Sequence, residues 1–325
     1  MAEKKRLLVI DSNSLIHRAF HALPPLTAKE GELVNAVYGF LLVFFRVLKD
    51  FQPDFIAAAF DLPVPTFRHK KFKEYKAKRP PTPKELSSQI PKVKEVLRAF
   101  NAPIFEKQGF EADDIIGTIA REAPILWRQD GRGPKIETII VSGDLDTLQL
   151  VDSNTKNYTL RRGLKDAVLY DEKLVKEKYQ GLTPSQILDF KGLKGDPSDN
   201  IPGVAGIGEK TAIKLISEFG SLESLYEEIK RESQKAKSIK PKLKEILVHS
   251  KEQAFLSKML VTIKQDVPID FNLKKCQWKD YDRNKVIKIF VSLSFKSLIG
   301  RLPTPGAEKK TKSEKLKIGD NLTMW

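Results

Sequence analysis

Three short apolar runs dominate the first half of the chain, at 7–10, 55–60 and 137–143. Short runs with mostly apolar residues at successive positions, such as 139–141 within the third, are typical of strands that are buried on both faces. Between and beside them, segments 33–49, 85–100 and 111–127 carry apolar residues every three or four positions, as amphipathic helices do. Buried strands that alternate with helices predict an α/β fold with a mainly parallel central sheet covered by helices.

Weaker patterns complete the expected elements. They predict a short strand at 103–106, a hairpin from 157–160 and 168–170, helices at 172–179, 184–191, 208–219, 222–229 and 241–257, and a last strand at 257–263. We therefore expect an α/β core over 1–170 and a helical region over 171–302. From 303 to 325, Lys, Glu, Ser, Thr and Gly dominate, which predicts a basic, disordered tail.

Acidic residues follow the three buried strands at their carboxyl ends: Asp11, Asp61 and Asp144, with Asp146 two residues further on. Ligands of open α/β sheets bind beyond these ends of the strands. The helix at 111–127 begins with three more carboxylates, Glu111, Asp113 and Asp114. An acidic first turn alone is common, because it complements the helix dipole. Together with three strand-end aspartates, however, it favours one shared acidic site that needs a cation.

The chain is strongly basic, with 57 Lys and Arg against 42 Asp and Glu and a net charge of +15. Such an excess points to a polyanionic partner, most simply nucleic acid. The densest basic patch lies within 63–83, where residues 66–79 hold seven Lys or Arg and one Glu, interleaved with Phe67, Phe72 and Tyr75. Two interpretations stay open: a solvated amphipathic helix, or an excursion that grips phosphates while its aromatic rings stack on bases.

Several classes of protein are disfavoured. A single cysteine, Cys276, excludes an internal disulfide, fits a reducing cytoplasm and, with four scattered His, argues against a zinc site. The apolar run 7–10 stops at Asp11 and is too short for a signal peptide. The longest apolar stretch, 36–45, is about half of a membrane span. We expect a soluble, cytoplasmic protein.

A glycine-rich loop at 203–211 resembles two nucleotide-binding motifs but matches neither. Glu209 separates Gly208 from Lys210, which a P-loop does not allow, and Thr211 stands where a dinucleotide fingerprint has its last glycine. The loop is either a helix–hairpin–helix element, which holds duplex phosphates through backbone amides, or a plain turn between helices. Upstream, Asp196 and Asp199 resemble a motif of haloacid-dehalogenase-type phosphatases, but 11–13 lacks their Asp-x-Asp nucleophile.

Taken together, these motifs resemble the 5′-nuclease domain of bacterial DNA polymerase I, within the flap-endonuclease superfamily, over about 7–302. The resemblance is carried by segments in the family's order and spacing: 9–11, 60–61, 67–68, 75–79, 109–114, 143–148, 195–203 and 206–212. One departure is Leu145, where these domains often carry Lys. Leu145 lies between Asp144 and Asp146, so it should alter the surroundings of the site rather than abolish metal binding.

The resemblance implies the roles of individual residues. It implies a PIN-like 5′-nuclease fold with a helical arch at 63–83 and a helix–hairpin–helix element near 193–220. The implied metal ligands are Asp11, Asp61, Glu111, Asp113, Asp114, Asp144, Asp146, Asp196 and Asp199, and Lys76 and Arg79 would contact the scissile phosphate. The implied DNA contacts also include Arg18, Arg68, Tyr75, Gly203, Gly206, Gly208, Lys210 and Thr211.

The implied activity is metal-dependent 5′-3′ exonuclease and flap endonuclease cleavage in DNA replication and repair. All-oxygen ligands suit two Mg²⁺ ions, with Mn²⁺ as a substitute, and the family has K⁺ at the helix–hairpin–helix element. Implied partners are DNA with 5′ flaps or single-strand/duplex junctions, RNA primers and a separate DNA polymerase, with the protein a monomer near the nucleoid. Two alternatives remain, a catalytically silent junction-binding protein and a PIN-like ribonuclease.

Overall fold

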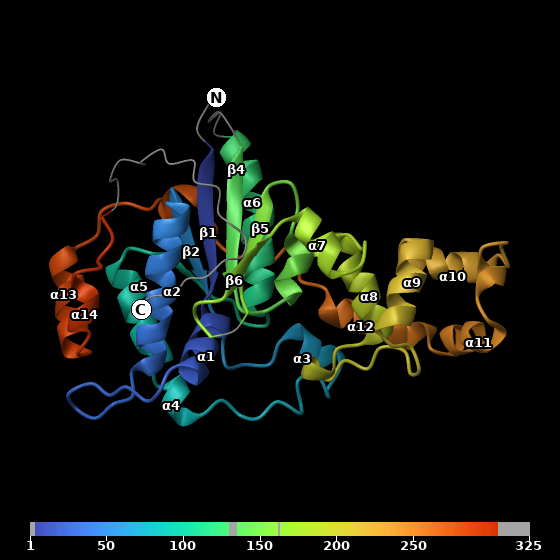
Figure 1. The fold of residues 1–325 in the computed structure, drawn as a ribbon, viewed down its shortest axis with the longest axis horizontal. Coiled ribbons are helices and arrows are strands. Elements are labelled where there is room, and N and C mark those ends of the chain that lie inside the picture. The colour runs from blue at the N-terminus through green and yellow to red at the C-terminus, as the bar shows by residue number, and fades with distance from the viewer. Residues whose placement is uncertain (1–3, 130–134, 162, 305–325) are drawn as a thin grey trace.

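The computed structural model describes residues 4–129, 135–161 and 163–304 (Figure 1). The expected tail at 303–325 lies outside these ranges except for its first two residues. An α/β core occupies one end of the longest axis of the molecule, and a group of helices projects from it at the other end. Within the described ranges, no helix has both the length and the apolar character that crossing a membrane requires.

A six-stranded sheet forms the centre of the core, in the order β3-β2-β1-β4-β5-β6. The strands are β1 (Lys5–Asp11), β2 (Phe55–Ala59), β3 (Ile104–Phe105), β4 (Ile136–Ser142), β5 (Thr155–Leu160) and β6 (Ala167–Tyr170). All neighbouring strands are parallel except β5 and β6, which form the expected antiparallel hairpin. The mainly parallel sheet is confirmed, and the carboxyl ends of β1, β2 and β4 meet at one edge.

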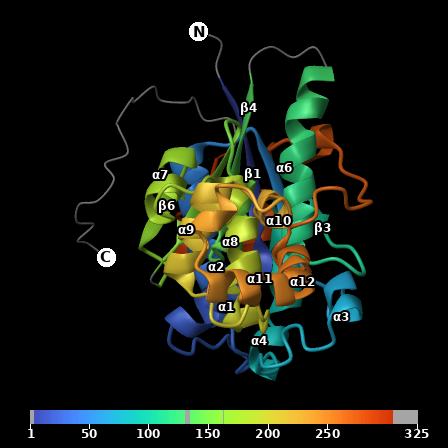
Figure 2. The same ribbon diagram turned by 90° about the vertical axis from the view of Figure 1, so that its right-hand side faces the viewer.

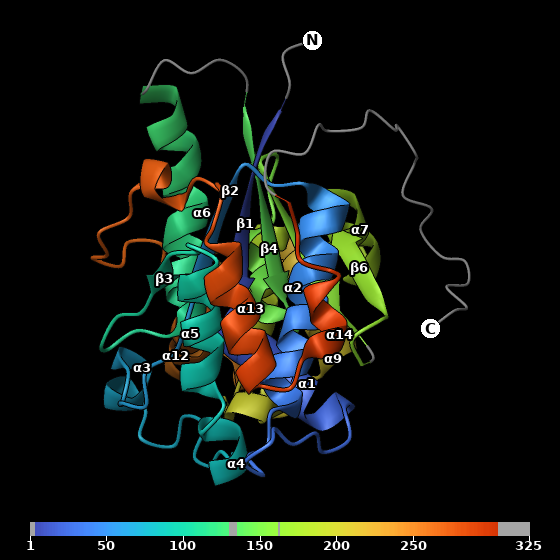
Figure 3. The same cartoon turned by 90° about the vertical axis from the view of Figure 1, so that its left-hand side faces the viewer.

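Helices cover both faces of this sheet. On one face α1 (Ser12–Ala22), α2 (Asn35–Phe51) and α5 (Ile90–Ala99) pack against Leu8 and Ile10 of β1, together with α13 (Arg283–Ser292) and α14 (Lys296–Ile299) (Figure 3). On the other face α6 (Ala112–Gln129) packs against Leu7 and Val9. Successive residues of β1 point to opposite faces, so its apolar run at 7–10 supplies both hydrophobic cores.

The projecting region has its own hydrophobic core, which includes Phe190, Ile216 and Leu225 (Figure 2). Its helices are α7 (Glu172–Lys178), α8 (Ile187–Lys194), α9 (Glu209–Phe219), α10 (Leu222–Lys230), α11 (Pro241–His249) and α12 (Lys251–Val261). After α12 the chain returns to the α/β core, where Ile263 and Phe271 pack with α6, and α13 and α14 pack with α2 and α5. The expected helical region at 171–302 thus ends spatially near 262.

Some expected elements were wrong in kind or extent. The strand expected at 257–263 is absent; 257–261 form the last turns of α12, with Ala254, Ser257 and Leu260 buried at helical spacing. The helix expected at 241–257 is two helices that meet at Ser250. The helix expected at 85–100 is divided into α4 (Lys84–Ser87) and α5, because Pro91 lacks the N–H that a continuous helix needs.

The basic segment 63–83 crosses from β2 to α4 and is helical only over α3 (Phe67–Lys71). Turns follow through Arg79. We call this segment the arch. Its aromatic residue Tyr75 is buried, and the backbone N–H of Lys76 donates to the carbonyl of Asp199 at 2.9 Å. Asn200 in turn donates to the carbonyl of Glu74. The second half of the arch is therefore anchored to the loop that follows α8.

A buried ion pair anchors the first half of the arch. The two terminal nitrogens of the Arg68 guanidinium donate to the two carboxylate oxygens of Asp114 at 2.7 and 2.8 Å, and both side chains are almost fully buried. Arg68 also donates to the carbonyls of Leu260 and Thr262. Asp114 accepts from the backbone N–H groups of Glu111 and Lys264. One pair thus joins the arch, the first turn of α6 and the segment that leaves α12.

We predict that removing one member of this pair destabilises the protein severely, because the other charge is then buried without a partner. Arg68→Met or Asp114→Leu alone should lower the free energy of unfolding by about 3–5 kcal/mol, and the double variant by much less than the sum. Equilibrium unfolding in urea measures this. The control is Lys173→Met, which breaks an exposed pair with Glu177 and should cost less than about 0.5 kcal/mol. Single variants as stable as this control would contradict the prediction.

Candidate functional site

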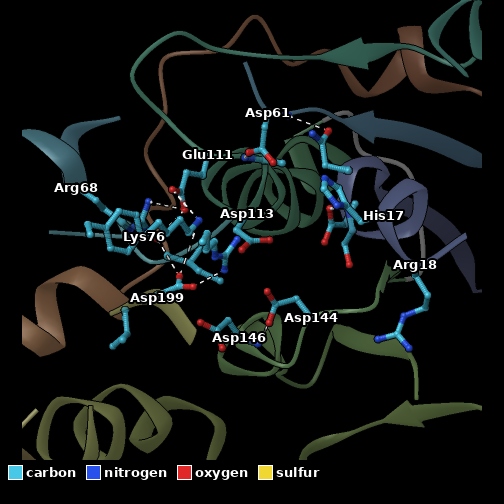
Figure 4. A pocket seen from close by; sticks show the side chains of 18 of the residues that line it. His17, Arg18, Asp61, Arg68, Lys76, Glu111, Asp113, Asp144, Asp146 and Asp199 are labelled. Atoms are coloured by element: carbon cyan, nitrogen blue, oxygen red, sulfur yellow. Dashed lines mark hydrogen bonds and ion pairs between the residues drawn. The ribbon is translucent and has the colours of Figure 1, made fainter. Parts of the chain in front are cut away.

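A cavity of about 650 Å³ opens beside the carboxyl ends of β1, β2 and β4 (Figure 4). The arch, α1, α6 and the loop after α8 supply the rest of its lining. Of the sequence-predicted residues, it brings together Asp11, Arg18, Asp61, Arg68, Tyr75, Lys76, Arg79, Glu111, Asp113, Asp144, Asp146 and Asp199. The expectation that separate acidic motifs converge is correct for seven carboxylates.

Backbone geometry fixes the carboxylates of the first two strands. Asp11 is the last residue of β1 and caps α1 by accepting from the N–H of Ser14, and it also accepts from the Ser142 hydroxyl at the end of β4. Asp61 accepts from the N–H of Ala112 at 2.7 Å. These hydrogen bonds hold Asp11 and Asp61 against the ends of β4 and α6, so two strand ends and a helix start share one wall of the cavity.

The remaining carboxylates of the α/β core lie around these two. Glu111 and Asp113 come from the start of α6, and Figure 4 shows Asp113 between Asp61 and Asp144. Asp144 and Asp146 follow β4, where one Asp144 oxygen accepts from the N–H of Asp146. The loop after β4 thereby folds back, and both side chains face the cavity.

Crowding among these groups makes their ionised forms costly. Burial raises the pKa of Asp113 well above its usual range, and the charges of Asp11, Asp144 and Asp61 raise it further. The pKa of Asp11 is raised to about 7, mainly by burial, although its hydrogen bond from Ser142 opposes the shift. Burial also raises the pKa of Asp61 and, to about 6, that of Asp146. The cluster is thus short of positive charge near neutral pH.

Two cations from the arch face the carboxylates. The ammonium of Lys76 donates to Glu111 at 2.9 Å and lies 3.8 Å from Asp199, and the guanidinium of Arg79 pairs with Asp199. Both side chains line the cavity. They are the two residues that the resemblance assigned to the scissile phosphate, and a phosphate placed among the carboxylates would lie within their reach.

The loop after α8 contributes two carboxylates with different surroundings. Asp199 is buried, lines the cavity and also accepts from the Tyr75 hydroxyl at 3.2 Å. Asp196 does not line the cavity and instead binds Lys191, which also contacts Asp146. Asp196 therefore adjoins the acidic site behind its wall, with a lysine between them.

Three expected roles do not fit the observed positions. Asp114 is fully buried and spends both oxygens on Arg68 and backbone N–H groups, so it does not face a metal site. Arg68 is buried in the same pair and cannot reach DNA while it holds Asp114. Tyr75 is 3% exposed and donates its hydroxyl to Glu111, so its ring is unavailable for stacking. Asp114 supports the site from behind its wall, whereas Arg68 and Tyr75 line the cavity and orient the Asp114, Glu111 and Asp199 carboxylates.

The glycine-rich loop between α8 and α9 also contains both buried and exposed residues among those expected to contact DNA. Gly203 is buried, with a φ of +61°, and a Cβ there would meet the backbone of Gly195 at 2.3 Å, so this glycine serves the packing of the loop. Gly206 and Gly208 are exposed and have open space around them. Lys210 is exposed at the start of α9. The outer part of the loop, with Thr211 behind it, is what a phosphate backbone could approach closely.

Several lining residues carry no motif and were missed in the sequence. Asn13 accepts from the N–H of Asp61, and His17 lines the cavity from the same helix, where burial lowers its pKa. A helix predicted directly after Asp11 would have placed both Asn13 and His17 beside the acidic site. Arg18, which was expected to bind DNA, donates to the carbonyls of Gly143 and Arg161 while lining the cavity.

The donor set suits hydrated divalent cations. Within the described ranges, no three His, Cys, Asp or Glu side chains are close enough together to enclose one ion. Mg²⁺, however, keeps several waters and is usually bound by one or two carboxylates together with substrate phosphates. Seven carboxylates around one cavity, several of them with raised pKa values, provide the hard oxygen ligands and the uncompensated negative charge that such ions require.

Known proteins share both the sequence and the fold. DNA polymerase I of Bacillus subtilis (strain 168) is 46% identical over 308 residues, and that of Caldicellulosiruptor bescii is 42% identical over 299 residues. These matches cover 95% and 91% of this chain but 33% of each relative, so the chain spans about a third of their length.

Solved structures resemble the fold over most of the chain. T5 5′-exonuclease with bound zinc has a TM-score of 0.62 at 23% identity, covering 79% of this chain and 89% of that chain. The catalytic core of Rad2 in complex with DNA substrate has a TM-score of 0.57 at 18% identity, covering 90% and 88%. At these identities the likeness establishes the fold.

Two family models account for nearly all of the described chain. The model of the 5′-3′ exonuclease N-terminal resolvase-like domain matches residues 6–180, and that of the 5′-3′ exonuclease C-terminal SAM fold matches residues 182–284. The first model spans the strands and the arch, and the second spans α8 to α12. The chain therefore belongs to the 5′-3′ exonuclease family.

Proposed function

We propose that this chain is a structure-specific nuclease that hydrolyses phosphodiester bonds at 5′ flaps and single-strand/duplex junctions of DNA. One observation carries the proposal: seven carboxylates from five separate segments and two arch cations, Lys76 and Arg79, line the same cavity. A phosphate can bind among carboxylates only if cations neutralise the negative charges of the phosphate and of the carboxylates. Family membership supports the same reaction.

Two Mg²⁺ ions, or Mn²⁺ in their place, would supply an activated water and stabilise the charge that develops on the phosphate and the leaving oxygen. Asp11, Asp61, Glu111, Asp113 and Asp199 would hold ions on one side of the cavity, and Asp144 and Asp146 on the other. The zinc in T5 5′-exonuclease supports a divalent metal in this fold.

The chain's own cations would bind and orient the phosphate. Lys76 lies between Glu111 and Asp199, and Arg79 lies against Asp199, so both are positioned at the cavity wall without substrate. Tyr75 holds the Glu111 and Asp199 carboxylates through its hydroxyl. The oxygens of a bound phosphate would replace these carboxylates as the hydrogen-bond acceptors of Lys76 and Arg79.

Selection of substrate would rest on shape and backbone contacts. The exposed outer loop with Gly206, Gly208, Lys210 and Thr211 would grip the duplex through backbone amides and the lysine, with K⁺ as a bridging ion. Single-stranded DNA would approach the cavity along the basic arch. RNA primers fit the same arrangement, because no base-reading element is required.

We further propose the setting in which this activity operates. The basic charge favours a location at the nucleoid in the cytoplasm, with the protein a monomer on its DNA. A DNA polymerase is the expected partner, since the matched relatives carry that name. The products of cleavage would be nicks that a ligation reaction can close.

We predict that Asp144→Asn reduces flap cleavage to about a hundredth of the parent's rate or less, because it removes a charged ligand at the centre of the site. The measurement follows a 5′-labelled flap DNA with Mg²⁺ or with chelator. Asp270→Asn is the control, since Asp270 is 91% exposed and lies outside the cavity. Tight flap binding without cleavage by parent and variants alike would favour a silent junction-binding protein instead, and cleavage of single-stranded RNA alone would favour a PIN-like ribonuclease.

We predict that Lys76→Met lowers the cleavage rate at saturating substrate by about 10²-fold, because an ammonium that faces the phosphate is lost. Lys78→Met is the matched control: it removes the same charge from an exposed position two residues along the arch. Single-turnover rates separate catalysis from binding. Equal losses in the two variants would mean that the arch contributes charge only, not a positioned group.

We predict that flap binding weakens steeply with salt and that Lys210→Gln reduces the slope of log K against log salt by about 1, because one phosphate contact is lost. Fluorescence anisotropy in Ca²⁺ over a range of KCl concentrations measures the slope. Lys4→Gln is the control, since Lys4 pairs with Glu137 near the amino ends of the strands, away from the site. A slope unchanged by Lys210→Gln would remove this lysine from the DNA interface.

A further inference from the structure

Lys191 is a charged residue that links the acidic site to the helical region and has no role in the proposed chemistry. It lies in the last turn of α8, and its side chain is 12% exposed. Its ammonium donates to Asp196 at 2.7 Å and also to Asp146. Asp146 follows β4 and lines the cavity, whereas Asp196 precedes the 3₁₀ turn at 197–199. A single ammonium thus bridges carboxylates from both regions of the chain.

The partners of these carboxylates show how firmly the ammonium is held. One oxygen of Asp196 accepts from the N–H and the hydroxyl of Ser198, and its other oxygen accepts from Lys191. Asp146 uses one oxygen for Lys191. The lysine therefore neutralises Asp196 and also Asp146, which lies across the cavity from Asp61 and Glu111 (Figure 4).

An ammonium in this position has a chemical competitor. Carboxylate oxygens are also the preferred ligands of Mg²⁺ and Mn²⁺, and a divalent ion and an ammonium that share the same carboxylates repel each other. The other lysine at the cavity, Lys76, lies at the opposite group of carboxylates, against Glu111 and Asp199. Each end of the acidic site thus has its own cation.

We propose that Lys191 is a built-in counter-cation that sets a low affinity for the divalent ion on the Asp144 and Asp146 side of the site. This inference rests on the proposed metal-dependent function. The ion must displace the ammonium from Asp146 before this carboxylate can contribute to its binding. The two ions therefore bind unequally, tightly on the Asp11 and Asp113 side and weakly on the Lys191 side, until a substrate phosphate adds ligands of its own.

The test is a titration of the whole chain with Mn²⁺ in the absence of DNA, followed by isothermal titration calorimetry. The parent should show one tighter and one weaker site. Lys191→Met, which keeps the length and apolar stem of the side chain but removes its charge, should tighten the weaker site by about tenfold or more and leave the tighter one unchanged. Lys191→Arg keeps the charge and should retain the parent's weak site.

A matched control comes from the same helix. Lys194 pairs with Glu209 at 2.8 Å on a more exposed surface, outside the cavity. Lys194→Met removes one charge from α8 that pairs with Glu209 rather than with Asp146 or Asp196, so both Mn²⁺ affinities should equal those of the parent. A tightening in both lysine variants would reflect overall charge and would overturn the proposal.

Thermal melting gives a readout that does not depend on ion stoichiometry. In chelator, Lys191→Met should melt below the parent, because Asp146 and Asp196 then face each other without a cation. Mn²⁺ should raise its melting temperature by more than it raises that of the parent. A folded Lys191→Met whose weaker site and Mn²⁺-induced shift match the parent's would overturn the role of Lys191 alone. A parent that takes up no Mn²⁺ with or without flap DNA would overturn this inference and the proposed metal dependence together.

Discussion

The pairing of Arg68 with Asp114 is the interaction on which the arrangement of the site depends. A buried guanidinium that makes two bonds to one carboxylate has a fixed orientation, and here its remaining donors reach the carbonyls of Leu260 and Thr262. The arch, α6 and the end of α12 are therefore fixed relative to one another at one point. Asp113 directly precedes Asp114, and adjacent helix positions point in different directions, so Asp113 faces the cavity while Asp114 faces inward; the Glu111 backbone is held by its N–H bond to Asp114.

The second constraint is the mutual repulsion of the carboxylates that this arrangement brings together. The protein offsets part of that repulsion with its own cations: Lys76 and Arg79 from the arch and Lys191 from α8. Burial and neighbouring carboxylates raise the pKa values of Asp11 and Asp113, so negative charge is most costly at these two groups. The electrostatic cost is thus concentrated where divalent ions and a phosphate would bind.

Much of this could be predicted from the sequence, because strand ends in a parallel sheet share an edge. Asp11, Asp61 and Asp144 follow apolar runs, so their convergence required only the fold class. The direction in which each carboxylate side chain points could not be predicted in the same way. Glu111, Asp113 and Asp114 are one to three positions apart, and only packing against Arg68 shows that Asp114 faces inward. The sequence of segment 257–261 is compatible with either a strand or a helix. In the structure it is helical, as part of α12, which packs against α8.

The loop after α8 explains how duplex binding and catalysis can be coupled in one small region. Its outer glycines, Gly206 and Gly208, face open space, whereas Asp199 a few residues earlier lines the cavity. The same loop holds the arch through the carbonyl of Asp199 and the side chain of Asn200. A duplex bound to the outer loop would therefore contact a segment that is hydrogen-bonded to Lys76 and Tyr75. Binding of a correct junction and ordering of the arch would then favour each other. Under the proposed function, shape selectivity would follow from this linkage without contacts to bases.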